Sequence, residues 1–174
     1  MRRFAINGSL WVTVLVAARV LAQPAVEPVH YSKLLPFLPE KVAGFVADKP
    51  KESATSAMGL KLTEVWRVYH RNSARGPETV TLKITDGAGN PFFTAAYADA
   101  KQFSNESPEG YQKGFTLDGY PAIEQYATAT KAGSLSVLIA DHDLVEISVQ
   151  GLDSATLQEW WKKVDAKKLA ALRE

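Results

Sequence analysis

The 174-residue chain carries 20 basic and 19 acidic side chains, which give a formal net charge of +1, and it contains no cysteine. A charge this close to zero argues against nucleic acid or an anionic membrane surface as a partner. The absence of cysteine excludes disulfides, thiol nucleophiles, thiolate metal sites and lipid-modified cysteines within this sequence.

Residues 1–22 have the organisation of a secretory signal peptide. Arg2 and Arg3 form a positive n-region, and residues 10–18 form an apolar run that is shorter than the ~20 apolar residues of a membrane-spanning helix. An uncleaved amphipathic N-terminal helix is the alternative. We predict export to the periplasm or the extracellular space, with no stable membrane insertion after cleavage. Residues 23–174 then form a single domain with a formal charge of −2.

The first part of this domain contains few regular patterns. Residues 30–38 are rich in leucine around Pro36, which predicts a short helix that ends near the proline and covers the core. Residues 44–46 predict a brief strand. Residues 48–59 are small and polar, so we expect a long loop there, and long loops often carry function.

A half-buried strand is predicted from residue 60 onward. Its core-facing side chains are expected to be those of one parity, namely Leu60, Leu62, Trp66 and Val68, whereas Lys61, Thr63, Arg67 and Arg71 are expected to face solvent. Lys61, Arg67 and Arg71, together with Lys83 of the next strand, could then form a small anion-binding strip. A solvated sheet face with no ligand explains the same residues.

The next strand, residues 79–85, alternates apolar and polar side chains and leads into a well-signalled helix. Asn90 is a suitable N-cap and Pro91 suits the first helical position. Apolar residues then recur at helical spacing, which predicts an amphipathic helix over residues 91–103.

Four further strands follow, at residues 111–117, 120–130, 134–140 and 144–150. The chain then closes on an amphipathic helix over residues 154–172, whose apolar stripe includes the adjacent Trp160 and Trp161. Core packing is the simpler role for both rings, and ligand stacking by Trp161 is the alternative. Together these patterns predict an α+β fold, a single domain built on a mainly antiparallel twisted sheet with flanking helices.

Several runs resemble a group of uncharacterised exported bacterial proteins. They are ITDGAGNP, AAYADAKQFSNESPEGYQKGFTLDGYPAIEQY, SLSVLIAD and GLDSATLQEWWKKVDAKKLAAL, and together they cover most of Leu60 to Leu172. The resemblance carries no established activity. The order of elements is also similar to the Mog1/PsbP-like fold, but a shared architecture does not fix function.

No catalytic constellation emerges from the sequence. The histidines His30, His70 and His142 lack metal-ligand spacing, and neighbouring side chains in a turn such as residues 141–143 are expected to diverge, so no metal or other cofactor is expected. The acid–base groups open to a site assembled from distant residues are Asp86, Asp118, His70 and His142.

The sequence therefore favours an exported, non-catalytic domain that binds a partner protein or small ligand through its sheet face or residues 48–59. Its weak candidate binding residues are Lys61, Arg67, Arg71 and Trp161. The alternative is a small periplasmic enzyme, which would need polar groups converging in a concave pocket. A carrier with an apolar cavity between sheet and helices is a third possibility.

Overall fold

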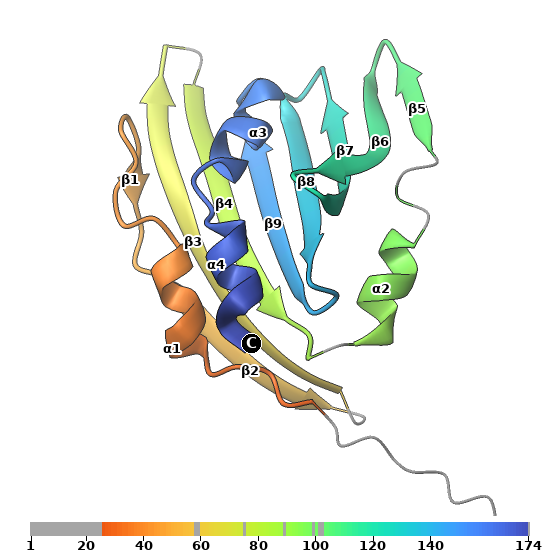
Figure 1. Cartoon of the computed structure of the whole chain (residues 1–174). Helices are drawn as coiled ribbons and strands as arrows, with labels where there is room; N and C mark the ends of the chain where they lie inside the picture. The colour runs from red at the N-terminus through yellow and green to blue at the C-terminus, as the bar shows by residue number, and fades with distance from the viewer. Residues whose placement is uncertain are drawn as a thin grey trace, which may run out of the picture.

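A computed structural model describes residues 26–57, 60–74, 76–88, 90–98, 100 and 103–173. The expected signal peptide at residues 1–22 lies outside the described residues. Nine strands form one antiparallel sheet in the order β1-β3-β4-β9-β8-β7-β6-β5, with β2 paired to β3 as well (Figure 1). The strands are β1 (Val46–Ala47), β2 (Lys51–Ala57), β3 (Leu60–Ser73), β4 (Gly76–Asp86), β5 (Ser104–Ser107), β6 (Gly110–Leu117), β7 (Tyr120–Ala127), β8 (Ala132–Ile139) and β9 (Asp143–Gln150).

The α+β prediction is wrong, because this is a largely β structure with few and short helices. Strand accounts for 51% and helix for 21% of the described residues. The helical segments are α1 (Tyr31–Leu34), η1 (Leu35–Phe37), α2 (Pro91–Tyr97), α3 (Ala155–Trp161), α4 (Ala166–Ala170) and η3 (Ala171–Arg173). Instead of a helix over 91–103, α2 has seven residues. Instead of a helix over 154–172, the chain breaks after α3, and Asp165 caps a new helix by accepting a hydrogen bond from the Lys168 amide.

One face of the sheet, here called the inner face, carries the main core. Alternate residues on the central strands point to it and are buried, including Val65 on β3, Leu82 on β4, Val137 on β8 and Ile147 on β9. Helices α1, α3 and α4 lie over this face (Figure 1). Trp160 of α3 packs against the ring of Tyr69 with ring centroids 4.5 Å apart. Burial of one aliphatic side chain of the inner face, such as Leu82, contributes about 1.5–3 kcal/mol to stability. The inner layer therefore dominates the stability of the fold.

The opposite face, here called the outer face, is covered only in part among the described residues. Helix α2 lies against β7 and β8, where Tyr97 and Ala100 pack on Leu138. Gly114 permits this approach, because a Cβ at that position would lie 1.4 Å from the Ala100 carbonyl oxygen. The rest of the outer face mixes polar and apolar side chains, as the cross-strand row of Trp66, Lys83, Glu146 and Ser136 illustrates.

Two local predictions fail at the β2–β3 edge. Residues 51–57 form β2, paired with β3 along its whole length, whereas a loop was expected there. The parity of β3 is also the reverse of the prediction, since Val65, Arg67 and Tyr69 point inward and Trp66 points outward. Both parities of this strand carry large apolar side chains, so the alternation alone did not identify the buried face.

The predicted start of α2 and the predicted core contact of residues 30–38 are confirmed. The Asn90 side chain accepts a hydrogen bond from the Phe92 amide at 2.9 Å, and Pro91 opens the helix. Leu34, Phe37 and Leu38 of the short N-terminal helix are buried against the core. Within the described residues, no helix has the length and apolar character required to cross a bilayer.

Candidate functional site

The basic residues proposed from the sequence do not form one exposed strip. Lys61 pairs with Glu27 at 2.5 Å, and the guanidinium of Arg71 lies 4.7 Å from the centre of the Phe45 ring. Arg67 is buried on the inner face, where it donates a hydrogen bond to the Pro39 carbonyl at 2.8 Å.

Lys83 cannot join these residues, because it lies on the outer face opposite Trp66. There it pairs with Glu64 at 3.7 Å and with Glu146. The expectation of a four-residue strip is therefore wrong in its geometry. A binding role for Lys61, Arg67 or Arg71 individually stays a prediction.

Trp161 is 3% exposed, and its indole nitrogen donates a 2.7 Å hydrogen bond to Oδ2 of Asp118. It lies beside an open hollow of about 560 Å³ that also has Tyr120 and Lys167 at its border. A ring this deeply buried offers little face for stacking, so the geometry favours the packing role.

The four acid–base candidates separate into three places. His70 pairs with Asp48 at 3.0 Å, and Asp118 binds the Trp161 indole. Asp86 and His142, by contrast, are brought together with Asp143 at the end of β4 and the start of β9. The expectation that side chains in this turn diverge is wrong for His142 and Asp143.

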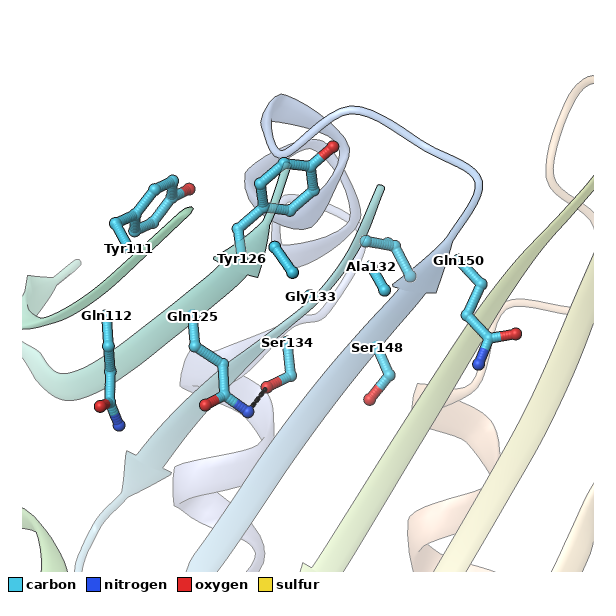
Figure 2. Close-up of a pocket in the computed structure, with 11 residues that line it drawn as sticks. Tyr111, Gln112, Gln125, Tyr126, Ala132, Gly133, Ser134, Ser148 and Gln150 are labelled. Carbon is cyan, nitrogen blue, oxygen red and sulfur yellow. Dashed lines mark hydrogen bonds between the residues drawn. The ribbon is translucent and has the colours of Figure 1, made fainter. Parts of the chain in front are cut away.

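A different feature stands out on the outer face of β6, β7, β8 and β9. The strand register places Gln112 opposite Gln125, Gln125 opposite Ser134, and Ser134 opposite Ser148. Because directly paired residues point to the same face, these side chains form one row across four strands (Figure 2). The Gln125 amide donates a 3.1 Å hydrogen bond to the Ser134 hydroxyl within this row.

This row lies in a hollow of about 500 Å³, here called the polar groove. The small side chains of Ser134 and Ser148 lie between the longer ones of Gln125 and Gln150 (Figure 2). Its described lining contains no charged side chain and consists of Tyr111, Gln112, Gln125, Tyr126, Ala127, Ala132, Gly133, Ser134, Ser148, Val149 and Gln150. A second hollow of about 250 Å³ shares Gln112 and Ala127 with it and extends toward Asn105 of β5.

Two tyrosines border the groove with their rings turned away from the glutamine row (Figure 2). The Tyr126 hydroxyl donates to the Leu152 carbonyl at 2.9 Å, and the Tyr111 hydroxyl donates to Oε1 of Glu124 at 2.5 Å. Burial, and next the Glu124 carboxylate, raise the pKa of Tyr111 to about 12. Both hydroxyl groups are thus bonded to residues outside the glutamine row. Tyr111 stays protonated at neutral pH.

Gly133 of β8 lies directly against the backbone of β7. A Cβ at this position would lie 2.5 Å from the Gln125 carbonyl oxygen. Real Cβ atoms do not come so close to a backbone atom, so any other residue would push the two strands apart. The glycine is therefore compatible with the close pairing of these strands, in which Gln125 and Ser134 are hydrogen-bonded.

The sequence prediction did not identify any residue of the polar groove. The signal present in the sequence was parity, because Gln112, Gln125, Ser134 and Ser148 occupy the outward positions of four consecutive strands. No family model, curated protein or solved structure matches this chain. The resemblances drawn from the sequence stay predictions, and the groove has to be interpreted from its own chemistry.

Proposed function

We propose that this chain is a non-catalytic binding protein whose polar groove takes a small uncharged ligand rich in hydroxyl groups, such as a short oligosaccharide. The observation that carries the proposal is the row of Gln112, Gln125, Ser134 and Ser148 across four strands. Amide and hydroxyl groups both donate and accept hydrogen bonds, as a ligand hydroxyl does, so the two chemistries match.

The absence of charge among the described lining residues supports an uncharged ligand. A charged ligand would lose hydration on entering the groove and gain no opposite charge there. Each hydrogen bond made in place of one to water contributes about 0.5–1.5 kcal/mol, so several are needed for useful affinity. The four-strand row provides them on a rigid sheet, which lowers the entropy lost on binding.

The same lining supports a non-catalytic role. General acid–base catalysis needs a group whose pKa lies near the working pH. The titratable groups at the groove are the phenols of Tyr111 and Tyr126, and burial raises the pKa of each. Neither phenol is suited to exchange a proton at neutral pH.

The proposed location of this binding protein is outside the cytoplasm, in the periplasm or beyond it. That part of the proposal depends on the leader-like sequence of residues 1–22. A binding protein in such a compartment would meet free and polymeric carbohydrate. The polar groove would be open to it, because Gln112, Gln125 and Ser148 are exposed.

Isothermal titration calorimetry tests the ligand class directly. Cellotetraose, maltotetraose and chitotetraose serve as neutral probes, and tetragalacturonate serves as the charged comparison of similar size. We expect saturable binding of at least one neutral probe and none of tetragalacturonate. Tighter binding of tetragalacturonate, or no binding of any neutral probe at millimolar concentration, would refute the proposal.

A further inference from the structure

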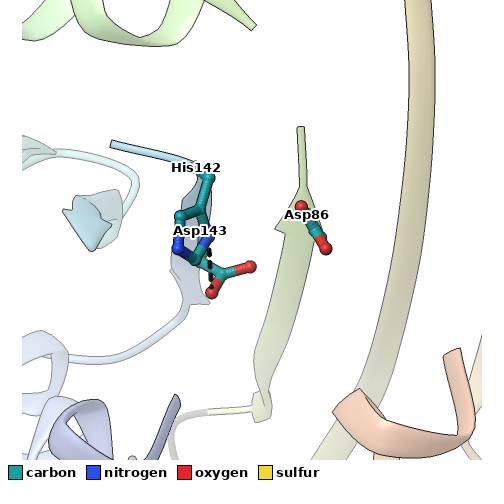
Figure 3. A group of neighbouring side chains, drawn as sticks. All are labelled: Asp86, His142 and Asp143. Carbon is teal, nitrogen blue, oxygen red and sulfur yellow. Dashed lines mark ion pairs between the residues drawn. The ribbon is translucent and has the colours of Figure 1, made fainter. Parts of the chain in front are cut away.

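A second cluster of polar side chains lies at the end of the sheet opposite the polar groove's glutamine row. Strand β4 ends at Asp86, which is paired in register with Asp143 at the start of β9, and His142 lies in the turn just before. One ligand-type atom from each of these residues lies within 4.8 Å of the other two. Figure 3 shows the Asp143 carboxylate between the His142 imidazole and the Asp86 carboxylate.

Two atoms of this cluster are buried without a hydrogen-bond partner among the described residues. They are Nδ1 of His142 and Oδ1 of Asp143, and Asp143 as a whole is 1% exposed. Buried polar atoms are paired in nearly all proteins, and the exceptions call for an explanation. Figure 3 shows the unpaired oxygen of Asp143 directed toward Asp86, into the centre of the cluster.

The spacing of His142 and Asp143 also suits two ligands of one ion. Nδ1 of His142 lies 3.1 Å from Oδ2 of Asp143, but the imidazole is not oriented to donate a hydrogen bond across that gap. Two ligand atoms bound to one tetrahedral zinc ion at about 2.0–2.1 Å are about 3.3–3.4 Å apart. The observed spacing is close to that of two neighbouring ligands.

We propose that Asp86, His142 and Asp143 form a binding site for one divalent transition-metal ion, zinc being the best match to the ligands. Three protein ligands of the imidazole and carboxylate type leave one coordination position open, as in many zinc sites. Calcium and magnesium prefer oxygen-only sites with more ligands, so the imidazole disfavours them. The His142 side chain is 14% exposed, which leaves a path for the ion to enter.

Arg173 is the charged group that competes with this ion for Asp86, to which the Val29 and Ala88 amides also donate hydrogen bonds. Its Nη2 donates to both carboxylate oxygens of Asp86, at 2.5 Å each. Two carboxylates and one guanidinium leave the cluster with a formal charge of −1 when the imidazole is neutral. Zinc and the Arg173 guanidinium are both positive and compete for the Asp86 carboxylate. Removal of the guanidinium should therefore strengthen zinc binding.

Zinc titration of the metal-free full chain, followed by calorimetry, tests the site, and cobalt(II) substitution gives an independent spectroscopic signal. We expect one zinc ion per chain and visible cobalt absorption bands of a four-coordinate site. His142→Ala should weaken zinc binding at least 10-fold, whereas Arg173→Met should tighten it. His70→Ala is the matched control, because His70 also pairs with an aspartate but lies elsewhere on the sheet.

Three results would overturn the proposal. They are no saturable zinc binding to the wild-type chain, equal affinity in the His142→Ala and His70→Ala variants, or weaker binding in an Arg173→Met variant that circular dichroism shows to be folded. Should His142→Ala fail to fold, the imidazole nitrogen signals of His142 in the wild-type chain give the same answer by NMR. They must shift on addition of zinc, and unchanged signals would exclude His142 as a ligand.

Discussion

Arg173, at the end of the described chain, donates to both carboxylate oxygens of Asp86, which lies 87 residues earlier. Asp86 is fully buried and also accepts a hydrogen bond from the Val29 amide at 2.6 Å. One carboxylate at the end of β4 therefore connects the first described segment and the last one to this strand.

Arg173→Met should destabilise the protein strongly, because it leaves the Asp86 charge buried without its partner. Removing one member of a buried ion pair costs about 3–5 kcal/mol, and we expect the lower end because the Arg173 side chain is 17% exposed. Urea unfolding in the absence of metal measures the effect. Lys168→Met on α4 is the control, since Lys168 is exposed. Equal stability of both variants would show that the pair contributes little.

Alkaline pH should destabilise the fold through its buried tyrosines. Burial is the main cause that raises the pKa of Tyr69, Tyr97 and Tyr111 to about 12, from the ordinary value of 10.0. The folded chain therefore keeps protons that the unfolded chain releases. This stabilisation is complete below about pH 10 and is lost as the pH rises toward 12.

Guanidinium unfolding at pH 9 and pH 11 checks this prediction, with a lower midpoint expected at pH 11. Tyr69→Phe should reduce the pH dependence, because it removes one of the three phenols. It should also cost about 1 kcal/mol at pH 9, since the Tyr69 hydroxyl donates to the Pro39 carbonyl. An unchanged midpoint in the wild-type protein would mean that these phenols ionise as freely when folded as when unfolded.

Gly114→Ala should loosen the cover over the outer face. The added methyl group would overlap the Ala100 carbonyl oxygen, so α2 or β6 has to move. Overpacking of this kind costs about 1–3 kcal/mol. Gly119→Ala is the comparison variant without a steric overlap, because no atom lies within 4 Å of its added Cβ. Its positive φ of 92° adds backbone strain to that variant. Thermal denaturation of the two variants measures the difference, and a smaller loss at Gly114 would contradict close packing there.

Trp161 should behave as a packing residue. Trp161→Phe keeps most of the buried ring but removes the hydrogen bond to Asp118, which predicts a loss of about 0.5–1.5 kcal/mol. Trp161→Ala should cost about 3–5 kcal/mol because it leaves a cavity in the core. Urea unfolding separates the two. A ligand-stacking role would instead show as reduced ligand affinity with near-wild-type stability.

Elements whose structure depends on neighbouring residues in the chain were predictable from the sequence. Asn90 and Pro91 start α2 through their own conformational preferences, and the β8–β9 hairpin follows from two apolar-rich alternating runs joined by a short turn. Strand β2 was missed because residues 51–57 are polar on both faces and form a strand only through pairing with β3. The predicted helix over residues 154–172 is divided in the structure, because Asp165 caps the separate helix α4.

The two candidate sites could not be predicted from the sequence, because they depend on which strands are neighbours. Gln125 and Ser148 look like ordinary solvated strand positions until the register places them in one row. Asp86 and Asp143 are 57 residues apart in sequence and meet only because β4 and β9 are neighbours in the sheet. Alternation predicts which side of a strand is polar, but the order of the strands decides which polar groups meet.

The polar groove is tested by its exposed hydroxyl positions. Ser148→Leu should fill the groove and abolish oligosaccharide binding, because a bulky apolar side chain replaces a small donor in the row. Thr116→Leu is the matched control, since Thr116 is an exposed hydroxyl residue on β6 outside the groove. Calorimetry with the neutral oligosaccharide that binds the wild-type chain should distinguish the two, and equal affinities would place the ligand elsewhere.

The most direct measurement of the central claim is the NMR response of the glutamine side-chain amides during titration with the neutral oligosaccharides. The account predicts that the amide signals of Gln112, Gln125 and Gln150 shift together and saturate at one ligand per chain, while that of Gln158 on α3 stays unchanged. If these three groove signals do not move with any of the probes, or if Gln158 responds in their place, the polar groove is not the binding site.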